Sequence, residues 1–188
     1  TLNINSATAI GNGTFTIAGG VIDNTSAGAL TLSNNNVQNW NGDFSFNGTR
    51  DLNLGTGAVT MNASRTVTVT AGNLTVGGAI AGTGFGLTKN GTGTLILSGA
   101  NTYNGTTTIN AGTITLGSAD RMADTSDLNV GASGTFNLGG FNETLGSLTG
   151  SGNITLGTGT LTTNSTSNTT FSGLISGTGG LTKNGSST

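Results

Sequence analysis

The chain has 188 residues and a net charge of only −2, and Gly, Thr and Asn together account for 97 of its residues. It has no Cys and no His, which excludes a disulfide framework and thiolate metal sites and removes the usual general base. Its five Lys and Arg residues are too few to neutralise a nucleic-acid backbone, and no apolar run approaches the ~20 residues of a membrane span.

The first 50 residues contain short alternating apolar runs, at 30–32 and 44–46, with an amide-rich interruption at 34–42. Trp40, the only tryptophan, lies in that interruption. An aromatic ring among amides can act as a sugar-stacking platform, but aromatic side chains more often belong to the core. We therefore expect Trp40 to fill the interior or to cover a corner.

From residue 52 onward the alternation of apolar and polar residues becomes regular, as expected for strands whose side chains switch face at every residue. Every third run recurs after 20 to 22 residues: Leu52 to Leu74, Val59 to Ile80, Val67 to Leu87 and Leu74 to Leu95. Three short strands in a turn of about 21 residues indicate an all-β fold, a right-handed parallel β-solenoid.

A meander of antiparallel hairpins is the competing topology, because Asn-Gly turns also favour hairpins. The meander explains the alternation but not the recurrence at every third run. One strand face is consistently Thr, Asn or Ser, as in a sheet that is dry inside and wet outside. We expect about nine turns, spanning roughly 40 Å at ~4.8 Å per turn.

A longer motif stands at residues 82–117, and its opening recurs at 177–185 without the place held by Phe85. The motif comprises Gly84, Gly86 through Leu95, Leu97 through Tyr103, and Gly105 through Gly117. It resembles the autotransporter-associated β-strand repeat of bacterial passenger regions. The resemblance implies an extracellular or cell-surface location and a structural role.

We expect residues 1–188 to form a single solenoid segment, less regular over 1–50, with repeat units at 82–117 and 177–188. The chain begins at Thr1 in a strand-like pattern without a signal peptide. We therefore expect a fragment or subunit of a longer array, whose partners are further repeats or identical chains at its ends. A host-surface or matrix ligand is possible; nucleic acid and a membrane span are not expected.

The carboxylates are sparse for an enzyme. Asp23 and Asp43 are 20 residues apart, and Asp124 and Glu143 are 19 apart, so either pair can stack on adjacent turns. Only Arg121 supplies a nearby cation. We predict no catalytic residues, no cofactor and no enzymatic activity. Lys89 and Lys183, both in Leu-Thr-Lys-Asn-Gly, are expected to be solvated at turns.

Residues 118–127 form the most charged segment, for which we expect a loop with a helical turn. Its acids Asp120, Asp124 and Asp127 are weak candidates for Ca²⁺, which prefers oxygen ligands. Their spacing matches no EF-hand loop. We favour helix caps, turn residues or an Asp120–Arg121 pair over a metal site.

Three functions remain open. The leading one is a non-enzymatic stalk, scaffold or adhesin passenger segment; the first alternative is the subunit of an extracellular fibre stacked head to tail. The second alternative is a solenoid face that binds carbohydrate or ice through a ladder of Thr-x-Thr pairs. That ladder is expected to break where Thr88 is followed by Asn90.

Overall fold

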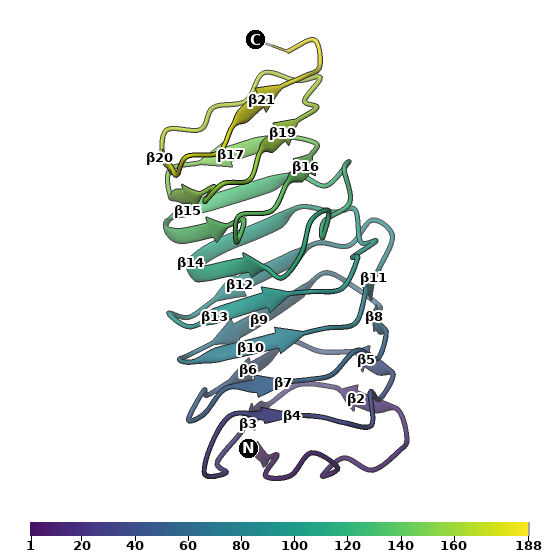
Figure 1. Cartoon of the computed structure of the whole chain (residues 1–188). Coiled ribbons are helices and arrows are strands. Elements are labelled where there is room, and N and C mark those ends of the chain that lie inside the picture. Colours follow the sequence, from purple (N-terminus) through teal and green to yellow (C-terminus); the bar gives the residue numbers. More distant parts are fainter. Residues whose placement is uncertain (188) are drawn as a thin grey trace.

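The computed structural model describes residues 1–187, within which the chain folds into a column of parallel strands and forms no helix (Figure 1). Strands of successive turns lie side by side across the long axis, with the two termini at opposite ends. About nine turns are stacked, roughly 21 residues apart. The predicted parallel solenoid is confirmed, and the antiparallel meander is wrong.

The strands lie on three faces of the column. The first face comprises β1 (Leu2–Asn3), β3 (Val21–Asp23), β6 (Phe44–Phe46), β9 (Arg65–Val69), β12 (Leu87–Asn90), the first halves of β14 (Thr107–Leu116) and β15 (Leu128–Asn137), and β17 (Leu148–Gly150). The second comprises β4 (Leu30–Thr31), β7 (Leu52–Asn53), β10 (Asn73–Val76), β13 (Thr94–Leu97), the second halves of β14 and β15, β18 (Asn153–Thr155) and β20 (Leu174–Ser176).

The third face is divided. Its N-terminal sheet comprises β2 (Phe15–Ile17), β5 (Gln38–Trp40), β8 (Val59–Met61) and β11 (Ile80–Ala81). Its C-terminal sheet comprises β16 (Glu143–Leu145), β19 (Leu161–Thr163) and β21 (Leu181–Lys183). The first two faces instead form one continuous sheet, because β14 and β15 run through the corner between them and pair on both sides.

The pairing register confirms most of the predicted period. Leu74 pairs with Leu52 and with Leu95, and Ile80 pairs with Val59. The predicted match of Val67 with Leu87 is wrong: Val67 is level with Lys89. A shift of two residues keeps every side chain on its expected side of the strand, because the side-chain period is two.

The core is the column of inward side chains that strand alternation predicts. Seven apolar residues at inward positions of the alternation are all buried: Leu54, Val69, Leu95, Leu97, Leu116, Leu138 and Leu156. Trp40 is also fully buried, with its ring edge-on to Phe44. The core interpretation of this tryptophan is therefore confirmed, and the sugar-stacking platform is wrong.

Lys89 is buried, not solvated as expected. It occupies an inward position of β12, between Val67 of β9 and Ile109 of β14. Its ammonium donates hydrogen bonds to the carbonyl oxygens of Asn90 (2.9 Å), Gly91 (2.8 Å) and Ala111 (3.2 Å). Lys89 therefore fastens the corner of one turn to the corner of the next. Burial lowers the pKa of Lys89 to about 8.

Two regions depart from the regular stack. Residues 118–127 form the expected loop but without a helix; its one short-range turn joins Ser126 N–H to Ala123 O at 2.8 Å. At the C-terminal end Leu174 and Leu181 are 64% and 53% exposed, and Lys183 is exposed as expected. Thr188, which closes the predicted unit 177–188, lies outside the described residues. No helix among residues 1–187 is long and apolar enough to cross a membrane.

Candidate functional site

The carboxylates of the N-terminal half are engaged in hydrogen bonds that join adjacent turns. Asp23, which is 3% exposed, accepts hydrogen bonds from the Thr49 amide (3.0 Å) and the Thr49 hydroxyl (2.6 Å). Asp51 accepts from the Asn73 amide (2.9 Å) and from its side-chain nitrogen (2.8 Å). Both acids therefore serve as caps for backbone N–H groups at corners.

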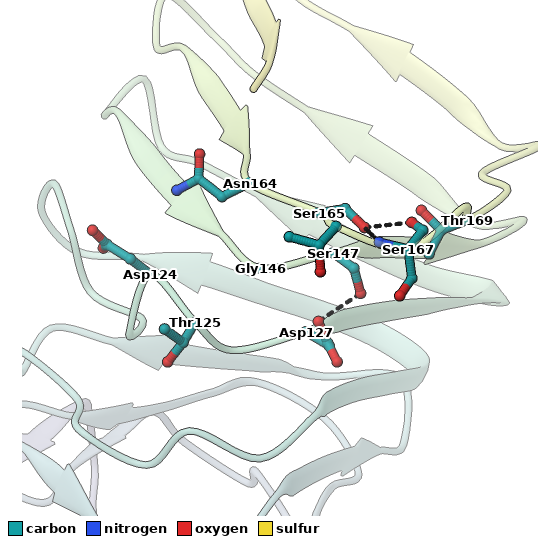
Figure 2. A pocket seen from close by; sticks show the side chains of 10 residues that line it. Asp124, Thr125, Asp127, Gly146, Ser147, Asn164, Ser165, Ser167 and Thr169 are labelled. Carbon is teal, nitrogen blue, oxygen red and sulfur yellow. Dashed lines mark hydrogen bonds between the residues drawn. The ribbon is translucent and has the colours of Figure 1, made fainter. Parts of the chain in front are cut away.

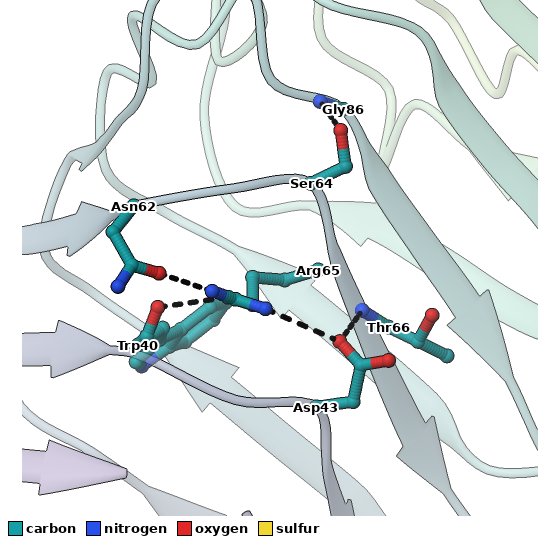
Figure 3. A network of polar contacts seen from close by, with 7 residues as sticks. All are labelled: Trp40, Asp43, Asn62, Ser64, Arg65, Thr66 and Gly86. Atoms are coloured by element: carbon teal, nitrogen blue, oxygen red, sulfur yellow. Dashed lines mark hydrogen bonds and ion pairs between the residues drawn. The ribbon is translucent and has the colours of Figure 1, made fainter. Parts of the chain in front are cut away.

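A polar network fixes the corner that contains Asp43 (Figure 3). Asp43 accepts a hydrogen bond from the Thr66 amide (2.9 Å) and lies 3.8 Å from the Arg65 guanidinium. Arg65 also donates to the Trp40 carbonyl oxygen (2.9 Å) and to the Asn62 side chain. The guanidinium thus ties the corner 40–43 to the corner 62–65 of the next turn and pairs with the only ion-paired carboxylate among the described residues.

The structure does not bring Asp23 and Asp43 together. Strands β3 and β6 pair Val21 with Ser45 and Ile22 with Phe46, so Asp23 is level with Asn47 and not with Asp43. The stacking on adjacent turns that their spacing of 20 residues allows is therefore wrong for these two acids.

The second candidate pair, Asp124 and Glu143, is not formed either, because Glu143 binds the backbone of Arg121 and Met122. Its carboxylate is 1% exposed and accepts hydrogen bonds from the amides of Arg121 (2.8 Å) and Met122 (3.2 Å). Burial raises the pKa of Glu143 to about 7, backbone hydrogen bonds oppose the shift, and the charge of Asp120 adds to it. Within the described chain no cation forms an ion pair with this carboxylate.

A line of polar side chains replaces strand pairing where the third face is interrupted between β11 and β16. Asn101 accepts a hydrogen bond from the Ile80 amide (2.8 Å) and donates to the Arg121 carbonyl oxygen (2.7 Å); Glu143 then binds the Arg121 amide. Beside this line the Tyr103 hydroxyl meets the Thr107 hydroxyl at 2.8 Å. Burial raises the pKa of Tyr103 to about 12. The line carries backbone hydrogen bonding across the gap.

The three weak metal candidates do not form a cluster. Asp120 lies at a turn with φ of +52°. Asp127 accepts a hydrogen bond from the Ser147 hydroxyl (2.6 Å), and Asp124 points into solvent. Across residues 1–187 no group of three His, Cys, Asp or Glu side chains is arranged to hold a metal ion.

A concave polar site, which we call the notch, lies in the C-terminal half of the chain (Figure 2). It has a volume of about 390 Å³ and lies at the corner between the third and first faces. Its lining residues come from three successive turns: Asp124, Thr125, Asp127, Gly146, Ser147, Asn164, Ser165, Thr166, Ser167 and Thr169. Sequence reasoning singled out the two acids but had no signal for the notch itself.

The outer side of the first face carries the column of hydroxyl groups considered for ligand binding. Thr88 is level with Thr66 and with Thr108. In the neighbouring column, however, Asn90 is level with Thr68 and its side-chain oxygen accepts a hydrogen bond from Asn110 (2.9 Å). The predicted break in the Thr-x-Thr ladder is confirmed.

Residues 87–116 match the profile of the Passenger-associated-transport-repeat. The chain is also similar to the Adhesin BmaC autotransporter of Brucella suis biovar 1 (strain 1330), with 42% identity over 129 residues. That alignment covers 63% of this chain but 4% of the relative, so the chain spans a small part of that protein's length. No solved structure matches the chain.

Proposed function

We propose, from the passenger-associated-transport-repeat that residues 87–116 form within a β-solenoid, that the chain is a non-enzymatic passenger segment. It acts as a stalk, scaffold or adhesin passenger of a bacterial protein that is secreted or displayed on the cell surface. The similarity to an autotransporter adhesin supports this setting.

The hydrogen bonds that the acidic side chains accept from their own stack are the observation that favours a structural role over catalysis. Asp23, Asp43, Asp51, Asp127 and Glu143 each accept a hydrogen bond from a residue on an adjacent turn. Glycoside hydrolysis needs two carboxyl groups facing a substrate across roughly 5–10 Å. These carboxylates instead face backbone and side-chain donors of their own stack.

Two measurements test the proposed function. Antibodies against the chain should label intact cells of the organism that produces it, and labelling confined to permeabilised cells would contradict the location. The purified chain should release no products from pectin-like or neutral polysaccharides beyond a heat-killed control. Cleavage that disappears in Asp23→Ala or Asp43→Ala would overturn the non-enzymatic role.

The exposed C-terminal turn favours a second candidate function, in which solenoid segments stack end to end in a fibre. The two ends of the column differ. At the N-terminal end the core is covered: Ile4 and Leu32 are 0% and 1% exposed, and Ser33 N–H bonds to Ala7 O (2.9 Å) across the first turn. At the other end Leu174 and Leu181 face solvent, and β20 and β21 have free edges. Unpaired edges next to apolar side chains are a template for further strands.

We expect the purified chain to form head-to-tail oligomers whose size grows with concentration in sedimentation velocity. Leu181→Lys should shift the distribution to monomers, because a charge at this edge opposes burial by a second turn. Leu2→Lys, at an exposed apolar position of the opposite end, tests whether that end takes part. A wild-type chain that stays monomeric at high concentration would exclude self-stacking.

A further inference from the structure

The notch arises from unequal corner lengths on three successive turns. On the middle turn only Gly146 and Ser147 separate β16 from β17. On the turn before, this corner is the C-terminal part of the 118–127 loop, and on the turn after it is the excursion 164–170. A short corner between two long ones leaves a recess, whose floor is Gly146–Ser147 and whose walls are 124–127 and 164–169.

Backbone hydrogen bonds hold both walls to the floor. Gly146 N–H bonds to Ser126 O (2.9 Å), and Asn164 N–H bonds to Leu145 O (2.9 Å). In the upper wall the Ser165 hydroxyl donates to Ser167 O (2.6 Å). A side chain at Gly146 would meet Thr125 O at 2.8 Å, so glycine is needed for the close approach of floor and lower wall. The recess is thus fixed by the stack before any ligand arrives.

Several polar groups of the notch are free to bind a ligand. The side chains of Asp124 and Asn164 are exposed, and neither has a hydrogen-bond partner among residues 1–187. Figure 2 shows the Asn164 side chain above that of Asp124, on the same side of the view. The hydroxyl of Thr169 is also exposed. The notch therefore offers a charged acceptor, an amide that both donates and accepts, and hydroxyl groups.

The charges and polarity of the lining restrict the ligand. No Lys or Arg is among the lining residues, and the carboxylates Asp124 and Asp127 repel sulfate, phosphate and sugar acids. Asp124 and Asp127 are also the only acids of the lining, and within residues 1–187 no group of three His, Cys, Asp or Glu side chains is arranged to hold a metal ion. No large apolar side chain lines the notch itself; Leu148, Phe171 and Leu181 line a separate hollow beyond Ser165 and Thr169. The lining of the notch therefore favours a polar ligand over a lipid.

We propose that the notch binds one or two sugar units of an uncharged glycan. Carboxylate and amide oxygens accept hydrogen bonds from sugar hydroxyl groups, while the amide nitrogen and the Ser and Thr hydroxyls donate to sugar oxygens. The volume of about 390 Å³ lies in the range of small-molecule sites, about 300–1,000 Å³. The inference rests on the proposed passenger function, for which it supplies a ligand class and a place on the fold.

The test is a titration of the isotope-labelled chain with lactose, cellobiose and chitobiose, followed through backbone amide shifts. At least one of these sugars should move amides of 124–127, 146–147 and 164–169 and leave the rest of the chain unchanged. Asp124→Ala should weaken binding by about tenfold or more, because hydrogen bonds to a charged group are the stronger ones. Asn164→Ala should weaken it by about fivefold, because its amide is neutral. Both side chains lack partners, so thermal stability should not change.

Asn47→Ala is the matched control for Asn164→Ala, because Asn47 is an exposed amide at the end of β6, away from the notch. It should bind as wild type does. The proposal is overturned by shifts outside the notch, by the absence of shifts with all three sugars, or by stronger binding of sialyllactose or oligolysine. Sugar binding is measured on the isolated chain, whereas the cell-surface location is measured by antibody labelling of cells. Failure of the glycan proposal can therefore be distinguished from failure of the proposed passenger function.

Discussion

Trp40→Ala is expected to lower the free energy of unfolding by about 3–5 kcal/mol, the usual cost of removing a large buried aromatic side chain. The Trp40 side chain is fully buried. Its ring centroid lies 5.1 Å from that of Phe44 at an interplanar angle of 74°, and its indole N–H donates to the Gln38 side chain (3.3 Å). Urea denaturation followed by circular dichroism measures the change.

Trp40→Phe is the matched control, because it keeps an aromatic ring in the core while removing the indole N–H. We expect it to cost clearly less than Trp40→Ala, with most of the loss arising from the unpaired Gln38 oxygen. If Trp40→Ala unfolds at the same urea concentration as the wild-type chain, the packing of the N-terminal turns is not as described.

The second large effect is a loss of stability between about pH 4.5 and pH 7, caused by Glu143. Its pKa is about 7 in the folded chain, against an ordinary value of 4.5, so the folded state binds this proton more tightly than the unfolded state. The contribution of Glu143 to stability is therefore complete below pH 4.5 and is lost as the pH rises through 7. A shift of this size corresponds to about 3 kcal/mol.

Glu143→Gln should remove this pH dependence, which denaturation in urea at a series of pH values would detect. Below pH 4.5 the variant should be less stable than the wild-type chain, because its amide nitrogen would face a backbone N–H of Arg121 or Met122. This difference should shrink or reverse above pH 7, where the wild-type chain carries a buried charge that Gln lacks. Lys89 does not interfere with this measurement. Its pKa is about 8 in the folded chain, so its contribution to the free energy of unfolding changes only above pH 8. An unchanged slope between pH 4.5 and 7 in Glu143→Gln would assign the effect to other groups.

The period, the parallel pairing and the core could be predicted because each depends on local alternation. The same alternation placed Lys89 and Glu143 on the inward side of their strands, two residues from Leu87 and Leu145. Charge, however, argues against burial, and the prediction that Lys89 is solvated at a turn was wrong. The structure resolves the conflict with backbone partners that come from adjacent turns, which no local pattern reveals.

The notch could not be predicted for a related reason. Its acids were visible in the sequence, but the recess depends on which corners are level with each other. That alignment follows from the cumulative lengths of strands and loops over three turns. An error of a few residues in the extent of 118–127 or 164–170 would place Asn164 opposite a different corner.

The strands lie across the long axis of the column (Figure 1), and this orientation determines how the chain responds to tension between its ends. A pull along the axis opens the hydrogen bonds of the outermost turn one after another, while the turns beneath remain folded. Each released turn of roughly 21 residues extends to about 70 Å, at about 3.3–3.6 Å per residue, in place of a rise of ~4.8 Å. The segment can therefore lengthen many-fold in small increments, and each intact turn is a template on which the next one re-forms when the load falls.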